Sequence, residues 1–119
     1  MGPGLGASLA RRFAEKYAIA INARTQDFLG TLAKEIRARG GTALEVQADI
    51  SRPDQVSTAF RTIRDRLGEP EVLLFNEATG PFGSIDEVGA EQFDHCMRVN
   101  ALGAFLCAKR MCQGDDRAG

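Results

Sequence analysis

Short apolar runs alternate with amphipathic segments along this chain, and the alternation limits the possible folds more than any other feature of the sequence. Three apolar runs predict strands, at residues 18–22, 42–48 and 72–75. Apolar residues at helical spacing predict four helices, at residues 5–17, 28–36, 56–67 and 90–111. Because strands joined through helices form right-handed crossovers, the expected fold is α/β, with a parallel sheet covered by helices on both faces.

A glycine-rich turn opens the chain and leads directly into the first predicted helix. The first six residues are Met1-Gly2-Pro3-Gly4-Leu5-Gly6, and the apolar residues Leu9, Phe13 and Tyr17 follow Leu5 at a spacing of four. Unpaired backbone N–H groups at such a helix start, together with the helix dipole, favour the binding of a phosphate. A glycine- and proline-rich terminus without a binding role is the alternative that this motif alone leaves open.

Polar residues follow each of the three predicted strands. Asn22-Ala23-Arg24-Thr25 ends the first, Asp49-Ile50 follows the second, and Asn76-Glu77-Ala78 follows the third. Ser51 is a plausible cap for the helix after the second strand. In parallel α/β sheets, ligands bind beyond the carboxyl ends of the strands. Since the glycine-rich turn is expected at the same edge, the sequence predicts a dinucleotide site there.

Composition argues against several other classes of protein. The 119 residues carry a formal net charge of −1, from 15 basic and 16 acidic residues mixed along the chain, so neither nucleic acid nor an acidic membrane surface is an expected partner. No apolar run approaches the roughly 18 residues of a membrane span. Three cysteines between residues 96 and 112, with the single His95, make a poor metal site. We therefore expect reduced thiols in a cytoplasmic protein of one domain, residues 1–119.

Four motifs occur in a characteristic order and spacing. They are Gly4-Leu5-Gly6, Ala48-Asp49-Ile50, Leu74-Phe75-Asn76-Glu77-Ala78 and Val99-Asn100-Ala101-Leu102-Gly103-Ala104-Phe105. Together they resemble the short-chain dehydrogenase/reductase family of nicotinamide-dependent oxidoreductases, and the resemblance covers nearly the whole chain. It implies a Rossmann-like, three-layer αβα fold with a parallel sheet. In that family a strand precedes the glycine turn and more strands follow the last helix, so we expect a partial dinucleotide-binding domain in which the first strand and the C-terminal strands are missing.

The resemblance also implies roles for the polar residues. Gly2, Pro3, Gly4, Leu5 and Gly6 would hold the pyrophosphate, Asp49 and Ile50 the adenine, and Asn76, Glu77 and Ala78 the adenosine ribose side. For Asp49 the alternative is a helix-start residue paired with Ser51, and Asn76 could simply cap its loop.

Arg24 and Thr25 bear on the choice of cofactor. Arg24 lies just past the strand at residues 18–22, which corresponds to the second strand of the family's fold. An arginine there suits the 2′-phosphate of NADP, whereas an acid there suits NAD, so NADP(H) is favoured over NAD(H). A solvated turn arginine is the alternative. Asn100, expected to be buried within an apolar helix segment, would support the catalytic tyrosine and lysine of the family. A core asparagine bonded to backbone is the alternative for that residue.

Two departures from the family pattern limit the prediction. Glu77 puts a negative charge where the family has a small residue, and Tyr17 is the only tyrosine, so the chain contains no Tyr-x-x-x-Lys. We expect the intact protein to interconvert a small carbonyl compound and an alcohol as a homodimer or homotetramer paired through the helix at 90–111, and the chain as written to be inactive. The alternatives are a non-catalytic nucleotide-binding or structural remnant and, less favoured because of Arg24, a methyltransferase.

Overall fold

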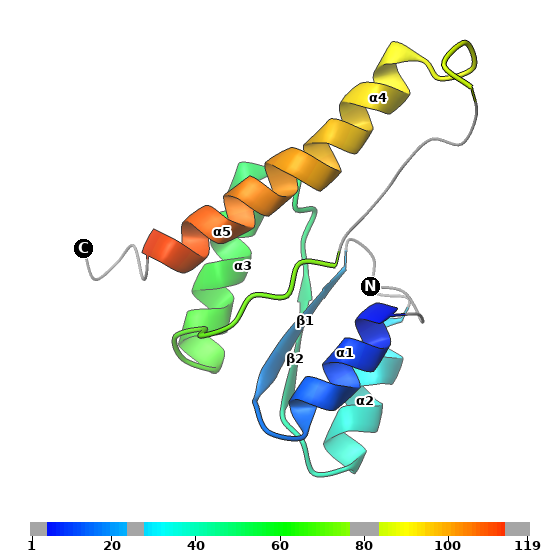
Figure 1. The fold of residues 1–119 in the computed structure, drawn as a ribbon. Helices are drawn as coiled ribbons and strands as arrows, with labels where there is room; N and C mark the ends of the chain where they lie inside the picture. Colours follow the sequence, from blue (N-terminus) through cyan, green and yellow to red (C-terminus); the bar gives the residue numbers. More distant parts are fainter. Residues whose placement is uncertain (1–4, 24–27, 77–83, 114–119) are drawn as a thin grey trace.

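The computed structural model describes residues 5–23, 28–76 and 84–113. Within these ranges the elements follow in the order α1 (Leu5–Ala14), β1 (Ile19–Ala23), α2 (Leu29–Ala38), β2 (Ala43–Gln47), α3 (Pro53–Arg66), α4 (Ala90–Met97), η1 (Arg98–Leu102) and α5 (Gly103–Gln113). The last three form one continuous helix, in which η1 is a π-helical turn (Figure 1). The four predicted helices and the first two predicted strands are therefore confirmed.

The two strands form a parallel sheet between two layers of helices. In its register Asn22 lies opposite Val46 and Ala23 lies opposite Gln47. The helices α1 and α2 cover one face of the sheet, and α3 and α5 lie on the other side (Figure 1). This is the predicted α/β, Rossmann-like arrangement of three layers, since parallel strands are joined by helices that cover the sheet faces.

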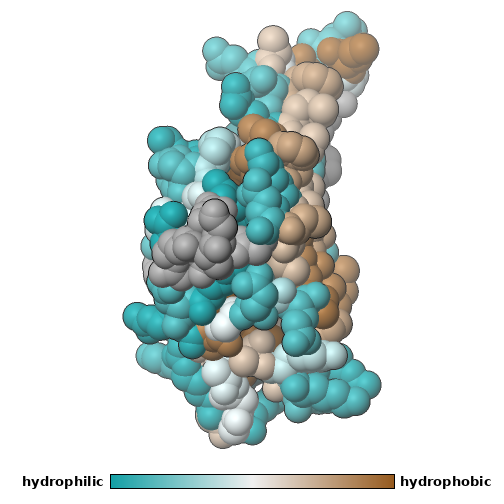
Figure 2. All heavy atoms as spheres, turned by 90° about the vertical axis from the view of Figure 1, so that its left-hand side faces the viewer, coloured by the Kyte–Doolittle hydropathy of each residue, from teal (hydrophilic) through white to brown (hydrophobic). Residues whose placement is uncertain are grey.

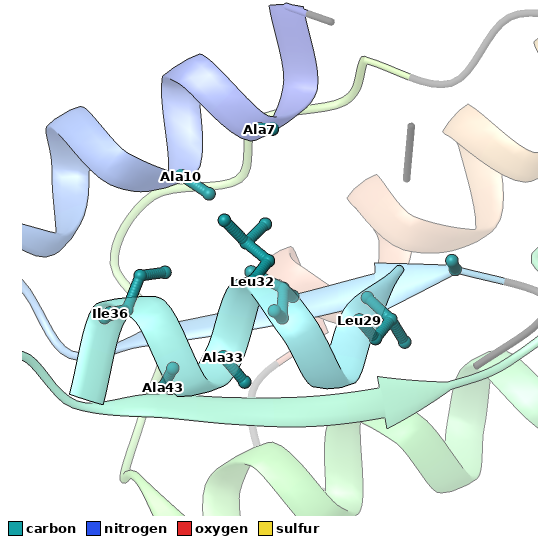
Figure 3. Packing of buried hydrophobic residues seen from close by; sticks show 9 residues of the cluster. Ala7, Ala10, Leu29, Leu32, Ala33, Ile36 and Ala43 are labelled. Carbon is teal, nitrogen blue, oxygen red and sulfur yellow. The ribbon is translucent and has the colours of Figure 1, made fainter. Parts of the chain in front are cut away.

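A core of small and branched side chains packs α1 and α2 onto β1. Leu29 and Leu32 of α2 are 0% and 1% exposed, and Ala7 and Ala10 of α1 are 0% and 7% exposed. Figure 3 shows Leu32 pointing from α2 toward Ala10. The small alanine side chains let α1 approach α2 closely, and burying each leucine contributes about 1.5–3 kcal/mol.

The buried face of α1 differs from the predicted one. The stripe that begins at Leu5 was expected to face the core, but Leu5 is 65% and Tyr17 48% exposed. Leu9, Phe13 and Tyr17 instead line a groove that runs beside β1. The alanines of α1 occupy the contact with α2, because only side chains of that size fit between two helices packed so closely on one strand.

The predicted third strand does not form. Residues 72–75 have no regular secondary structure, and Val72, Leu73 and Leu74 are 53%, 37% and 47% exposed. Residues 72–75 correspond to the fourth strand of a doubly wound sheet, which pairs with the first strand of the fold. The described residues contain only the pair β1 and β2. Without that neighbour, an apolar segment has no ladder of hydrogen bonds to join, so high strand propensity alone does not make it a strand.

The continuous helix from α4 to α5 has one packed face and one exposed apolar face. Val99 and Cys107 are buried, whereas Phe93, Met97 and Phe105 are 61%, 49% and 60% exposed. Figure 2 shows hydrophobic residues in a band that runs from the top of the molecule downward. This helix is therefore apolar on more than one side, and its second apolar face lacks a cover among the described residues.

Candidate functional site

A short turn after β2 carries two of the predicted cofactor residues, Asp49 and Ile50. The Ser51 N–H and hydroxyl donate to Asp49 Oδ1 over 3.0 and 2.7 Å, and the Asp49 N–H donates to Gln55 Oε1 over 2.7 Å. Ser51 therefore pairs with Asp49, and the prediction that Ser51 caps α3 was wrong. The N-cap of α3 is Arg52, which makes no side-chain capping bond, because a guanidinium group has no acceptor for the helix N–H groups.

The same turn is also hydrogen-bonded to β1. Asn22 Nδ2 donates to the carbonyl oxygens of Val46 and Ala48 over 2.9 and 3.3 Å, and the Ala48 N–H donates to the Ala23 carbonyl over 3.2 Å. The backbone that leads into Asp49 is thus bonded to the neighbouring strand through both a side chain and the main chain.

A third contact holds Ile50 against the long helix. A Cβ built on Gly103, the first residue of α5, would lie 2.8 Å from Ile50 Cδ1 and 3.0 Å from Ile50 Cγ1. A contact of this length is shorter than van der Waals packing allows, so the missing side chain at Gly103 is what lets Ile50 pack there. The turn after β2 is consequently fixed by residues of β1, α3 and α5.

A groove brings several predicted site residues together. Gly6, Ile50 and Asn76 line it with Asn22 and Ala48, and its volume is about 660 Å³. The rest of its lining is largely apolar and comes from α1, β1, α3, residues 67–75 and α5. Ile50 and Asn76 therefore share one concave surface with Gly6 at the start of α1, whereas Asp49 is not part of the lining.

The start of α1 is suited to an anion. The helix begins at Leu5 and carries no acidic residue in its first turn, so its own side chains do not neutralise the positive end of the helix dipole. Its first N–H groups have no acceptor within the helix, as at every helix start. Gly6 lines the groove, whereas the Leu5 side chain is exposed and is absent from the lining.

Asn100 lies away from this groove. It belongs to the π-helical segment η1, and its side chain is exposed, in contrast to the predicted burial. The prediction was wrong because apolar neighbours in sequence do not bury a helix position unless another element covers that face. The helix face that carries Asn100 has no such cover among the described residues. Single π-helical turns within α-helices occur frequently at functional sites.

Other predicted site residues lie outside the described ranges. They are Gly2, Pro3, Gly4, Arg24, Thr25, Glu77 and Ala78. Among the described residues there is no group of three His, Cys, Asp or Glu side chains placed to hold a metal ion, and no helix there combines the length and hydropathy that crossing a membrane requires. None of the three cysteines forms a disulfide, and His95 is exposed.

The sequence reasoning missed two residues that shape the turn, Gln55 and Gly103. Gln55 lies in the first turn of α3, where a side chain can reach back to the residues before the helix. Gly103 is an isolated glycine within a helical pattern, and such a glycine often marks a close approach of another element. Either signal could have pointed to the turn that contains Asp49 and Ile50.

Comparison with known proteins identifies the family. The family model described as short chain dehydrogenase matches residues 1–118. The chain belongs to the short-chain dehydrogenase family. It is 34% identical to an NADPH-dependent aldehyde reductase-like protein, chloroplastic, of Arabidopsis thaliana over 88% of this chain and 40% of that protein.

Solved structures of short-chain dehydrogenases have the same fold. A short-chain type dehydrogenase/reductase from Mycobacterium marinum gives a TM-score of 0.88 at 29% identity, over 92% of this chain and 45% of the other. An alcohol dehydrogenase from the archaeon Thermococcus sibiricus, complexed with 5-hydroxy-NADP, gives a TM-score of 0.83 at 26% identity, over 93% and 48%. The chain thus spans less than half the length of these relatives, as expected for a partial domain of the family.

Proposed function

We propose that this chain is the nucleotide-binding part of an oxidoreductase that interconverts a carbonyl compound and an alcohol and prefers NADP(H). The observation that carries the proposal is the meeting of Gly6, Ile50 and Asn76 at one groove in a chain of the short-chain dehydrogenase family. Two relatives support the choice of cofactor, one named as NADPH-dependent and one solved with 5-hydroxy-NADP. Because the chain spans less than half of either, the activity and the small-molecule substrate of the whole protein are part of the proposal.

The cofactor would lie along the carboxyl ends of the strands. Residues 2–6 and the N–H groups at the start of α1 would hold the pyrophosphate, since that helix end carries no acid of its own. Asp49 and Ile50 would bind the adenine, and residues 76–78 would contact the adenosine ribose. Arg24, with Thr25, would pair with the 2′-phosphate through charge-assisted hydrogen bonds. When bound, NADP(H) supplies or accepts the hydride.

Proton transfer needs residues beyond those in this chain. Tyr17, the only tyrosine, is followed four residues later by Ile21, so no tyrosine–lysine pair is available to move the proton that accompanies the hydride. We therefore infer that these 119 residues bind the cofactor without turning over substrate. Asn100 would serve as a support for a tyrosine and lysine supplied by further chain.

The long helix is our candidate for subunit pairing. Phe93, Met97 and Phe105 leave an apolar face exposed on it, and a second copy of this helix would cover that face in a homodimer or homotetramer. A cytoplasmic location is also part of the proposal, and the three cysteines of the described residues, which form no disulfide, support it.

Calorimetric titration with NADPH and NADH tests the cofactor assignment. We expect the chain to bind NADPH more tightly than NADH, and Arg24→Asp to reverse the order, with a loss of NADPH affinity of about 10- to 100-fold, because a charged hydrogen bond contributes roughly 1.5–3 kcal/mol. Arg12→Asp is the matched control, since this substitution makes the same change of charge at an exposed position of α1. A chain that is folded by circular dichroism and binds neither nucleotide would refute the proposal and favour the non-catalytic remnant, with Glu77 as the suspected cause.

The enzymatic part of the proposal has a separate test in the gene. An open reading frame that continues past Gly119 into a Tyr-x-x-x-Lys motif supports an oxidoreductase. A stop codon directly after Gly119, with no such motif supplied by a partner gene, counts against it. Neither result depends on whether the 119-residue chain binds a nucleotide.

A further inference from the structure

Asn22 is the residue whose hydrogen bonds the function above leaves without a role. We propose that Asn22 is a positioning residue for the cofactor, because its side-chain amide fixes the turn that presents Asp49 and Ile50 to the adenine. The inference rests on the proposed function for its ligand, and on the structure alone for the geometry of the turn.

The bonds of Asn22 go beyond what the sheet requires. In the parallel register Asn22 lies opposite Val46, and the main chain alone suffices to pair the two strands. The Asn22 side chain adds two further bonds, from Nδ2 to the Val46 carbonyl at 2.9 Å and to the Ala48 carbonyl at 3.3 Å. A primary amide has two N–H donors on one nitrogen, so it can satisfy both acceptors at once.

The two acceptors lie on either side of the point where β2 ends. Val46 belongs to β2, which ends at Gln47, and Ala48 immediately precedes Asp49. A clamp across these two carbonyls sets the direction in which the chain leaves the strand. That direction decides where the Asp49 carboxylate and the Ile50 main chain are placed relative to the groove, which Asn22 itself lines.

Removing the clamp should affect the turn more than the sheet. The strands stay paired over five residue pairs from Ile19 opposite Ala43 to Ala23 opposite Gln47. The turn, by contrast, would keep the Gln55 and Ser51 bonds but lose the amide bond to Ala48. Leucine is branched at Cγ like asparagine but has no donor, and the largely apolar groove that residue 22 lines can take its extra volume, so Asn22→Leu tests the loss of the N–H groups.

A double-mutant cycle with Asp49→Ala separates positioning from general stability. We expect Asn22→Leu to lower the affinity for NADPH about tenfold in the native background and by less when Asp49 is already alanine, because only the contribution through Ile50 then remains, and residues that act through one another are not additive. Thr42→Val is the control, a polar-to-apolar change directly before β2, at the end of the strand that is opposite to the turn. An equal loss in both backgrounds, or no loss in the native one, would overturn the positioning role.

Amide hydrogen exchange supplies a readout that needs no nucleotide. Asn22→Leu should speed exchange of the Asp49 and Ser51 amides several-fold and leave the Val46 amide unchanged, because local opening is confined to the turn. Unchanged exchange at Asp49 and Ser51 overturns the inference. If the native chain binds no NADPH, the proposed function fails, while exchange at these two amides still decides whether Asn22 positions the turn.

Discussion

Gly103→Ala tests whether the turn after β2 depends on close packing against the long helix. Gly103 has helical backbone angles, φ −58° and ψ −45°, so alanine can adopt its conformation without strain. The glycine is needed for space: an added Cβ would lie 2.8 Å from Ile50 Cδ1, 3.0 Å from Cγ1 and 3.5 Å from Cβ. Two atoms of this side chain, Cδ1 and Cγ1, would be crowded, so rotating the outermost methyl group alone does not relieve the contact.

The size of the effect follows from two opposed contributions. Replacing a helical glycine with alanine stabilises a helix by about 0.5–1 kcal/mol, because the unfolded chain loses freedom. Overpacking a well-packed site costs about 1–3 kcal/mol. Gly30→Ala provides the control within α2, since the nearest atom to its added Cβ is Glu45 Oε2 at 3.9 Å, an ordinary contact. We therefore expect Gly103→Ala to be less stable than Gly30→Ala by about 1–3 kcal/mol.

Urea unfolding followed by circular dichroism measures this difference directly. Gly30→Ala should unfold at a higher midpoint than the native chain, and Gly103→Ala at a midpoint below that of Gly30→Ala. Gly103→Ala should also weaken NADPH binding, because the displaced Ile50 shifts the turn that we propose binds the adenine. Equal midpoints for the two variants would show that Ile50 yields freely, and the account of a turn held by α5 would then be wrong.

Two further predictions concern α1 and the long helix. A hydrogen bond from Arg11 holds the pKa of Glu35 below its ordinary value of 4.5, with the charges of Arg11 and Arg39 adding to the effect and burial opposing it. The ionised Glu35 therefore stabilises the fold above its ordinary pKa, and this stabilisation is lost as the pH falls through the lowered pKa. Glu35→Gln should thus reduce the free energy of unfolding at neutral pH but not in strong acid, as measured by urea unfolding at both pH values. Phe105→Glu should convert a dimer to monomers in light scattering, with Thr31→Glu at an exposed position of α2 as the control. A native chain that is already monomeric contradicts the pairing.

The periodicity of apolar residues was sufficient to predict the elements that pack within the chain. Both strands of the sheet and every predicted helix are present, and Gly40 and Gly68, which follow α2 and α3, have φ angles of +88° and +99°. Such angles favour glycine, so these residues were reliable stop signals. Local pattern and fold agree here because the partner surfaces belong to the same 119 residues.

Two of the predictions that failed concern segments whose partners are not among the described residues. Residues 72–75 have the composition of a buried strand, yet a strand also needs a neighbour to bond with. Burial of Asn100 was inferred from its apolar neighbours, although burial depends on what covers that helix face. The alanine face of α1 could not be predicted from spacing, because Leu9 and Phe13 recur with the same period.

The turn after β2, proposed to bind the adenine, is supported entirely by residues of this chain. Each of its supports lies nearby in the fold: Asn22 on β1, Gln55 on α3 and Gly103 on α5. Asn76, by contrast, follows a segment with no strand pairing and is itself exposed. The residues proposed for the adenine therefore have a rigid frame from within the chain, whereas those proposed for the ribose depend on a neighbour beside β1. We therefore expect the affinity of this chain for the cofactor to come from contacts with the adenine.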